Sequence, residues 1–139
     1  MKIVLDTNVW LSAIFWEGEA NNLVEKCIKN KIEIIISYDI LSEIIDVLNK
    51  ETKFQRFIQE REDKVEDLIR TILSISSILE TSIKISEIKE HVKDNIILEA
   101  ALEGNAEYII SYDNHVLDLI EFRKIRILSP TDFLKVLNK

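Results

Sequence analysis

The chain has 139 residues, of which 47% are hydrophobic and 31% charged, so it is long enough to bury a core and too apolar for a disordered chain. Its formal charge of −7 argues against a protein held on nucleic acid by broad neutralisation of phosphates, although bound metal ions can supply local positive charge. With only two glycines, the chain has none of the glycine-rich loops that hold nucleotide phosphates.

The single cysteine, Cys27, excludes an internal disulfide and is typical of a protein from a reducing compartment. No apolar stretch is long enough to cross a bilayer, and the first residues lack the long apolar segment of a signal peptide. The sequence shows no linker, internal repeat or low-complexity tract. We therefore expect a cytoplasmic protein, without contact to a membrane, that folds as a single domain over residues 1–139.

An apolar run at residues 3–5 stops at Asp6, and residues 9–15 are expected to form one or two helical turns. A short apolar run bounded by polar residues is typical of a buried strand. In an open α/β sheet, the residue just past the carboxyl end of such a strand faces the crevice where ligands bind. Asp6 is therefore the first candidate site residue.

The next expected elements are a helix at residues 20–29 and a short strand at residues 32–36, which is dense in β-branched side chains. Ser37 and Asp39 offer N-caps for the helix that follows. The apolar residues of that helix share one face, and they are Ile40, Leu41, Ile44, Ile45 and Leu48.

Residues 52–55 resemble a capping box, which predicts the start of another helix, and residues 61–76 are expected to continue as helix. The residues expected to point inward from this second stretch are Val65, Leu68, Ile69, Ile72 and Leu73. A third strand is expected at residues 77–80, with residues 81–85 as the alternative.

The last third of the chain continues the alternation of helix and strand. A helix is expected to begin at Asp94 and to end with Gly104 at its C′ position. Strands are expected at residues 108–111 and 126–128, and Ser129 with the proline after it predicts the start of a final helix. Strands that alternate with helices predict a parallel sheet covered by helices on both faces.

Four acidic residues are candidates for one site. Asp6 and Asp113 directly follow the first and fourth expected strands, and Asp94 heads the helix before the fourth. Glu43 lies in the helix after the second strand. If the first and fourth strands are neighbours, these carboxylates converge at the carboxyl edge of the sheet. The ordinary alternatives are a helix cap for Asp94, a solvated helix position for Glu43 and a turn for Asp113.

Converging carboxylates need a counter-charge. Two carboxylates about 4 Å apart repel by roughly 4 kcal/mol at an effective dielectric near 20, so a cluster requires a cation or shifted pKa values. A set of oxygen ligands suits Mg²⁺ or Mn²⁺ rather than zinc, and such a site is typical of phosphoryl chemistry. His91 and His115 have no partner at a metal-binding spacing, so we expect both on the surface.

Three segments of the chain match a known family. They are LDTNVWLSA at the start, SEIIDVL around Glu43, and DNIILEAALEGNAEYIISYDNHVLDL from Asp94 to Leu119. With these segments the chain resembles the PIN-domain ribonucleases, in particular the VapC-like toxin components of prokaryotic toxin–antitoxin pairs. The resemblance covers essentially the whole chain. It implies a PIN-like three-layer α/β/α sandwich, here with a central parallel sheet of four to five strands.

The resemblance also implies a metal-dependent endoribonuclease that hydrolyses RNA phosphodiester bonds. Its catalytic and metal-binding quartet, for Mg²⁺ or Mn²⁺, would be Asp6, Glu43, Asp94 and Asp113. Asn8 would hold Asp6 in place by hydrogen bonding, and Ser111 would take the small hydroxyl position two residues before the last acid. Members usually act as homodimers and are inhibited by a small antitoxin that covers the site.

This sequence departs from the family pattern at two places. Asp94 is flanked by Lys93 and Asn95, where relatives commonly have consecutive aspartates. His115 stands where a further acid often follows the fourth one. Because the four principal acids remain, these departures put the number of bound metal ions in doubt more than the activity.

Other protein classes also place an aspartate after their first strand. A haloacid-dehalogenase-type phosphatase needs a second aspartate two residues on, where this chain has Asn8. A receiver domain needs an acidic pair near the first strand, which the lone Asp6 does not supply. The remaining alternative is a PIN fold that binds RNA or a partner protein without cutting it.

Aromatic and basic residues leave two further alternatives open. The aromatic residues Trp10, Phe15 and Trp16 either pack in the core or form a surface for a dimer or an antitoxin. Two basic groups are either solvated surface or contacts to phosphate, and they are Lys50, Lys53 and Arg56 in one region and Arg123, Lys124 and Arg126 in another.

Overall fold

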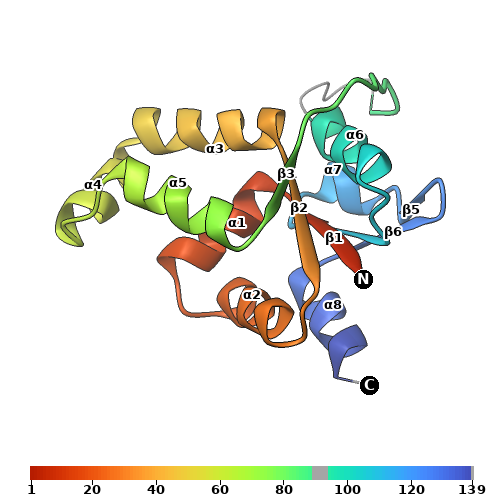
Figure 1. Ribbon diagram of the computed structural model, residues 1–139, viewed down its shortest axis with the longest axis horizontal. Coiled ribbons are helices and arrows are strands. Elements are labelled where there is room, and N and C mark those ends of the chain that lie inside the picture. Colours follow the sequence, from red (N-terminus) through yellow and green to blue (C-terminus); the bar gives the residue numbers. More distant parts are fainter. Residues whose placement is uncertain (89–93, 139) are drawn as a thin grey trace.

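The computed structural model describes residues 1–88 and 94–138. Within these residues six strands form one sheet in the order β3-β2-β1-β4-β6-β5. All neighbouring strands are parallel except the pair β5 and β6. The strands are β1 Lys2–Leu5, β2 Glu33–Ser37, β3 Ser77–Leu79, β4 Tyr108–Ile110, β5 Glu121–Phe122 and β6 Ile125–Leu128 (Figure 1).

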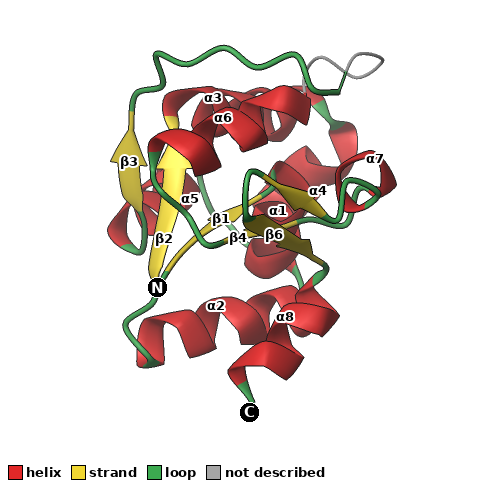
Figure 2. Ribbon diagram, turned by 90° about the vertical axis from the view of Figure 1, so that its right-hand side faces the viewer, coloured by secondary structure: helices red, strands yellow, loops and turns green. Residues whose placement is uncertain are grey.

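Helices cover both faces of this sheet. Figure 2 shows α3 and α6 on one face, and α2 and α8 on the other, so the fold is the three-layer α/β/α sandwich that the resemblance predicted. None of the helices in the described ranges is long and apolar enough to cross a membrane. The helices are α1 Thr7–Phe15, α2 Glu19–Lys29, α3 Tyr38–Lys50, α4 Thr52–Glu60, α5 Val65–Ser74, α6 Asn95–Glu103, α7 Asn114–Leu117 and α8 Pro130–Leu137.

Three of the four residues of the central strand β1, namely Ile3, Val4 and Leu5, have no exposure. Such a continuous apolar strand is typical of a parallel sheet with helices on both faces. The chain leaves β1 toward β2 and β3 on one side and later fills the other side with β4 and β6. The strand order therefore reverses between β1 and β4, and ligands bind at the carboxyl ends of strands at such a point. The first and fourth strands are neighbours, which was the condition for the acids to converge.

Most helix starts and strand positions agree with the sequence pattern. Ser37 caps α3 by accepting a hydrogen bond from the backbone N–H of Ile40 at 3.1 Å. Ser129 caps α8 in the same way by accepting from the N–H of Asp132 at 3.2 Å. The third strand lies at Ser77–Leu79, the first of the two alternatives.

The sheet has one strand more than the four to five expected. β5 is a two-residue edge strand that pairs antiparallel with β6 through a two-residue turn. A strand this short is below the length at which alternation of apolar and polar residues can be detected, and therefore no periodicity indicated it.

The connection from α3 to α4 does not contain the expected capping box. Glu51 is the N-cap residue of α4, and its side chain makes no capping hydrogen bond. The amide of Gln55 instead donates to the carbonyl oxygens of Leu48 and Asn49, at 2.8 and 2.7 Å. Gln55 therefore satisfies carbonyl groups at the end of the preceding helix.

The prediction of a continuous helix over residues 61–76 is wrong at its start. α5 begins only at Val65, and Glu62 before it has a positive φ of 54° that interrupts helical geometry. Leu68 and Ile72 are buried as expected, but Leu73 is 39% exposed. α5 is therefore shorter than expected, and its buried stripe is narrower.

Gly104 ends α6 for a different reason from the one expected. Its φ is −85°, and the following residue, Asn105, takes the left-handed conformation with a φ of 54°. A Cβ atom on Gly104 would lie 2.9 Å from Cγ2 of Ile35 and 3.1 Å from Cδ2 of Leu79. The glycine therefore allows the end of α6 to approach the sheet closely.

We predict that Gly104→Ala lowers the free energy of unfolding by about 1–3 kcal/mol, because the added methyl group overpacks a buried contact. The measurement is denaturant unfolding followed by circular dichroism. Gly18→Ala is the matched control, since a Cβ atom there meets nothing within 4 Å. The control is expected to lose less than about 1 kcal/mol, which reflects only the N-cap preference for Gly over Ala. Equal losses in the two variants would contradict the packing argument.

Candidate active site

Asp6 is the residue at which β1 ends and α1 begins. Its backbone N–H donates to the carbonyl oxygen of Ile110 at 2.9 Å, which continues the pairing of β1 with β4. Its carboxylate oxygen Oδ1 accepts a hydrogen bond from the N–H of Thr7 at 2.8 Å, so Asp6 is also the N-cap residue of α1. A negative charge is stabilised at this end of a helix. The half-buried carboxylate is thus fixed at the carboxyl edge of the sheet.

Ser111 connects Asp6 to the end of β4. Its side chain is fully buried, and its hydroxyl donates to Oδ2 of Asp6 at 2.7 Å. The same hydroxyl oxygen accepts a hydrogen bond from the N–H of Asp113 at 3.0 Å. The small hydroxyl expected at this position therefore orients the Asp6 carboxylate and the backbone of a second acid.

The electrostatic environment of Asp6 is unfavourable for its ionised form. Burial raises the pKa of the Asp6 carboxyl above its ordinary value, the hydrogen bonds from Ser111 and Thr7 lower it, and the charges of Asp94 and Asp113 raise it further. The net direction is upward. The fold therefore brings two of the other predicted acids, Asp94 and Asp113, into electrostatic range of Asp6.

Asp113 and Asp94 both lie at helix starts, but they use their side chains differently. Asp113 is the N-cap residue of α7, where its Oδ1 accepts from the N–H of His115 at 2.8 Å. The side chain of Asp94 makes no capping hydrogen bond at the start of α6. Both side chains are half-buried. The helix cap that was the ordinary alternative for Asp94 is therefore not formed by its side chain, whereas Asp113, for which the alternative was a turn, caps α7.

The remaining predicted residues are less closely tied to Asp6. Glu43 is a half-buried residue in the middle of α3, and within the described part of the chain it is not among the charges that raise the pKa of Asp6. Asn8 is exposed in the first turn of α1, and the hydrogen bonds to the Asp6 carboxylate come from Thr7 and Ser111. His115 is exposed, and His91 lies outside the described residues.

The donor chemistry at this edge fits a hard divalent cation, because the groups are carboxylates whose mutual repulsion a cation would relieve. Across residues 1–88 and 94–138, however, no group of three or more potential ligands is gathered closely enough to hold a metal ion. The structure thus contains three interacting carboxylates without a compact ligand cluster.

Two buried polar residues next to the site were not among the sequence candidates. The amide of Asn95 accepts from the N–H of Ile88 at 2.9 Å and donates to the carbonyl oxygen of Ile88 at 3.0 Å. Glu99, which is 4% exposed, accepts from the N–H of Ile85 at 2.9 Å. Through these bonds α6 holds Ile85 and Ile88 in place. A polar residue on the apolar face of a predicted helix is the pattern that could have indicated them.

The aromatic residues after the site divide between the two interpretations. Trp10 is 1% exposed and packs in the core, whereas Trp16 is 42% exposed. Lys53 lies over this exposed region, with its Nζ 5.5 Å from the centre of the Trp16 ring. The aromatic cluster, as we call it, is formed by Phe15, Trp16, Phe54 and Phe57.

Comparison with solved structures shows the same fold in three proteins. A chain of VapBC2 from Rickettsia felis, bound to a DNA fragment from its promoter, is 20% identical with a TM-score of 0.63, and the match covers 91% of this chain and 97% of that chain. A chain of VapBC-1 from nontypeable Haemophilus influenzae is 15% identical with a TM-score of 0.57, covering 94% and 99%. PAE2754 from Pyrobaculum aerophilum is 14% identical with a TM-score of 0.53, covering 100% and 91%.

Comparison of the sequence itself gives the family. No curated protein matches the chain significantly. The family model described as PIN domain matches residues 2–115, a range that includes all four candidate acids. Since the match spans most of the chain and the described residues have the expected sandwich, this chain belongs to the PIN domain family.

Proposed function

We propose that this protein is a Mg²⁺- or Mn²⁺-dependent endoribonuclease. The observation that carries the proposal is the Asp6 carboxylate, which Ser111 holds at the switch point of the sheet within electrostatic range of Asp94 and Asp113. Negative charge gathered at a ligand crevice is what a divalent cation would neutralise. PIN domains are generally nucleases, which supports hydrolysis of phosphodiester bonds as the reaction.

The proposed ligands of the metal are Asp6, Asp94 and Asp113, with Glu43 from α3 as the fourth acid. When bound, the metal supplies a water of lowered pKa as nucleophile and positive charge for the leaving oxygen. Ser111 keeps the Asp6 carboxylate in one orientation through its 2.7 Å hydrogen bond. A role for Asn8 in holding Asp6 stays a prediction.

The alternative function is binding of RNA or a partner protein without cleavage. It is favoured by one observation, namely that the carboxylates in the described ranges are not close enough to form a ligand cluster. The alternative and the proposed activity differ in a measurable way, since only the nuclease turns over RNA.

The proposed biological role is that of the toxin in a toxin–antitoxin pair, as the VapC-like resemblance implied. The VapBC structures that share this fold support a small antitoxin as the partner. We place the antitoxin contact on the aromatic cluster, because exposed aromatic side chains such as Trp16 are enriched at protein interfaces. A homodimer and a cytoplasmic location stay predictions.

Purified wild-type protein is expected to cleave single-stranded RNA only when Mg²⁺ or Mn²⁺ is present. Asp6→Asn should reduce the rate at least about 100-fold, because a loss of about 2.7 kcal/mol of transition-state stabilisation is expected when a central metal ligand is neutralised. The measurement is cleavage of end-labelled RNA resolved on a denaturing gel. Glu43→Gln is expected to reduce the rate as well.

Asp46→Asn is the matched control for this experiment, since Asp46 is an exposed acid on the same helix as Glu43. It should leave cleavage unchanged. Cleavage at equal rates by wild type and Asp6→Asn would refute the proposed site. If wild type cuts no RNA but binds it, the alternative function is correct.

The raised pKa of Asp6 predicts a specific dependence of stability on pH. A carboxyl group whose pKa is higher in the folded than in the unfolded state destabilises the folded state at pH values above the unfolded pKa. As pH falls, the folded state binds a proton before the unfolded state does, and wild type should gain stability relative to Asp6→Asn. This gain is complete only below pH 3.8, the ordinary pKa of the group. The measurement is thermal unfolding of both proteins in EDTA.

Addition of millimolar Mg²⁺ at neutral pH provides the test of metal binding that does not depend on activity. The melting temperature of wild type is expected to rise, because a ligand that binds only the folded state stabilises it. The melting temperature of Asp6→Asn should change less. Equal shifts in the two proteins would place the metal elsewhere.

A further inference from the structure

A second charged site lies at the amino end of the parallel strands, opposite the end that carries the carboxylates. A cavity of about 410 Å³ opens between the end of α6 and the hairpin of β5 and β6. Its wall includes Asn105 and Tyr108 together with three basic residues. We call these three the basic hairpin residues, and they are Arg123, Lys124 and Arg126.

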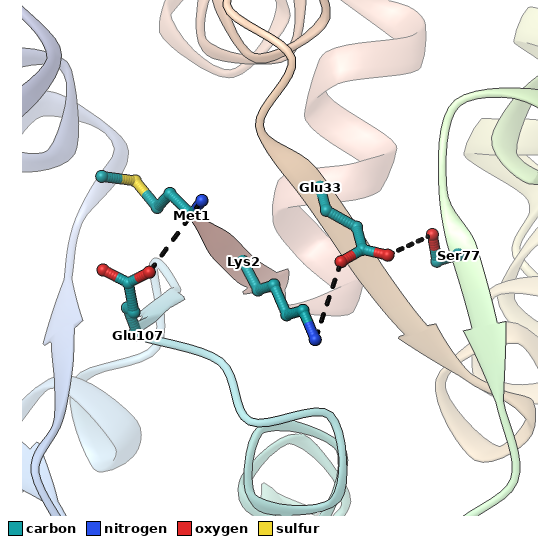
Figure 3. Close-up of polar contacts among 5 residues, drawn as sticks. All are labelled: Met1, Lys2, Glu33, Ser77 and Glu107. Atoms are coloured by element: carbon teal, nitrogen blue, oxygen red, sulfur yellow. Dashed lines mark hydrogen bonds and ion pairs between the residues drawn. The ribbon is translucent and has the colours of Figure 1, made fainter.

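Two acids neighbour the basic hairpin residues, Glu107 in the cavity wall and Glu121 opposite Arg126 in the pairing of β5 with β6, but neither forms an ion pair with them among the described residues. Within the described ranges, none of the basic hairpin residues has a carboxylate oxygen within 4.0 Å of its nitrogen atoms. Glu107 is the acid in the cavity wall, and its Oε1 lies 4.0 Å from the N-terminal ammonium of Met1 (Figure 3). Three cations therefore lie together without an ion pair to the described residues, on a chain with a net charge of −7.

The backbone of the hairpin is also unusual for the residues that it carries. Arg123 and Lys124 form the two-residue turn between Phe122 and Ile125, and their φ angles are 47° and 71°. Turns with two positive φ angles strongly favour Asn-Gly, and the left-handed conformation costs other residues roughly 1–2 kcal/mol each. The chain thus keeps two cations where stability alone would favour other residues.

Aromatic rings hold both guanidinium groups in place. The Cζ atom of Arg123 lies 5.1 Å from the centre of the Phe122 ring, and that of Arg126 lies 5.8 Å from the centre of the Tyr108 ring. A guanidinium group over an aromatic face keeps its N–H donors free at its edge, where they match the oxygens of a phosphate group.

We infer that the basic hairpin residues bind phosphate groups of the RNA substrate, away from the cleavage site. This inference rests on the proposed function. It adds a second RNA-binding surface, separate from the four acids. Arg126 pairs with Tyr108, and Ser111 lies three residues further along the chain from Tyr108. At about 3.3 Å per residue, the two sites are separated by about 10 Å along the strand direction.

The two sites lie at the two ends of β4 and β6, on the same side of the sheet. β5 is the last strand at that side, and β6 next to it packs against α7, which begins after Asp113. A single RNA strand that follows this side can therefore place one phosphate at the acids and others at the hairpin.

The inference is tested by binding of labelled single-stranded RNA to the full-length Asp6→Asn protein, which is not expected to cut it. In this background Arg123, Lys124 and Arg126 are changed together to Gln, and fluorescence anisotropy is measured over a series of salt concentrations. Affinity is expected to fall at least tenfold. The slope of log affinity against log salt should decrease by about 2, since each lost phosphate contact on a single strand contributes about 0.7.

Two further variants separate local phosphate binding from net charge and from misfolding. Lys29, Lys31 and Lys135, which are exposed outside the cavity, are changed together to Gln, and this equal loss of charge should leave the slope unchanged. The pair Arg123→Asn with Lys124→Gly should raise the melting temperature, because both residues accept positive φ angles. The same pair should weaken RNA binding. A more stable protein that binds less RNA cannot be explained by unfolding.

Each outcome bears on one proposal. If Asp6→Asn binds no RNA, or if the basic hairpin variants keep its affinity and slope, the inference is wrong even when wild type cleaves RNA. An equal loss of binding in the lysine control also overturns it. If the slope decreases as expected but wild type cleaves no RNA in Mg²⁺ or Mn²⁺, the inference holds and the proposed nuclease activity fails.

Discussion

The hydrogen bond from the Ser111 hydroxyl to Oδ2 of Asp6 is the contact on which the candidate site depends. Ser111 connects the ends of β1, β4 and β6. Its N–H donates a hydrogen bond to the carbonyl oxygen of Leu128 at 3.1 Å, and its hydroxyl oxygen accepts one from the N–H of Asp113. A fully buried hydroxyl with both donor and acceptor roles satisfied tolerates little displacement. The position of the acids therefore follows from the pairing of β1, β4 and β6.

Both proposed binding sites keep features that are unfavourable for stability. At the carboxyl end of the strands, Asp6 is held partly out of water beside the charges of Asp94 and Asp113. At the other end, Arg123 and Lys124 adopt backbone conformations that favour other residues. Such local costs persist only where the surrounding structure compensates for them, here through a core around the buried residues Ile3, Val4 and Leu5 of β1.

The parts of the fold that the sequence predicted are those with strong periodicity or clear capping residues. β1 was predictable because its apolar run ends sharply at Asp6, and β5 was not, because two residues carry no period. The start of α5 was also beyond prediction, since nothing in residues 61–64 indicates the left-handed backbone of Glu62. The sequence predicted Gly104 as the C′ residue that ends the helix, whereas in the structure its missing side chain leaves space for Ile35.

The same distinction applies to the site. The sheet fixes the position of an acid that directly follows a strand. The proximity of Asp6 and Asp113 could therefore be predicted from the sequence. Glu43 lies on a helix whose apolar face indicates which side turns to the core, but its distance from Asp6 depends on where α3 packs across the sheet, which this pattern does not give. Thr7 donates to Asp6 through its backbone N–H, and a backbone hydrogen bond cannot be predicted from the residue type. The family resemblance had implied Asn8 for this task.

The two proposed sites also differ in what they require, because they lie at opposite ends of β4. The acidic edge repels phosphate until a cation is bound, whereas the basic hairpin attracts it at any time. At physiological salt the Debye length is about 8 Å, shorter than the separation of about 10 Å between the sites, so each acts on its own phosphates. RNA can therefore be held at the hairpin before the acids are neutralised. Binding then does not require a metal ion, and only the cleavage step does.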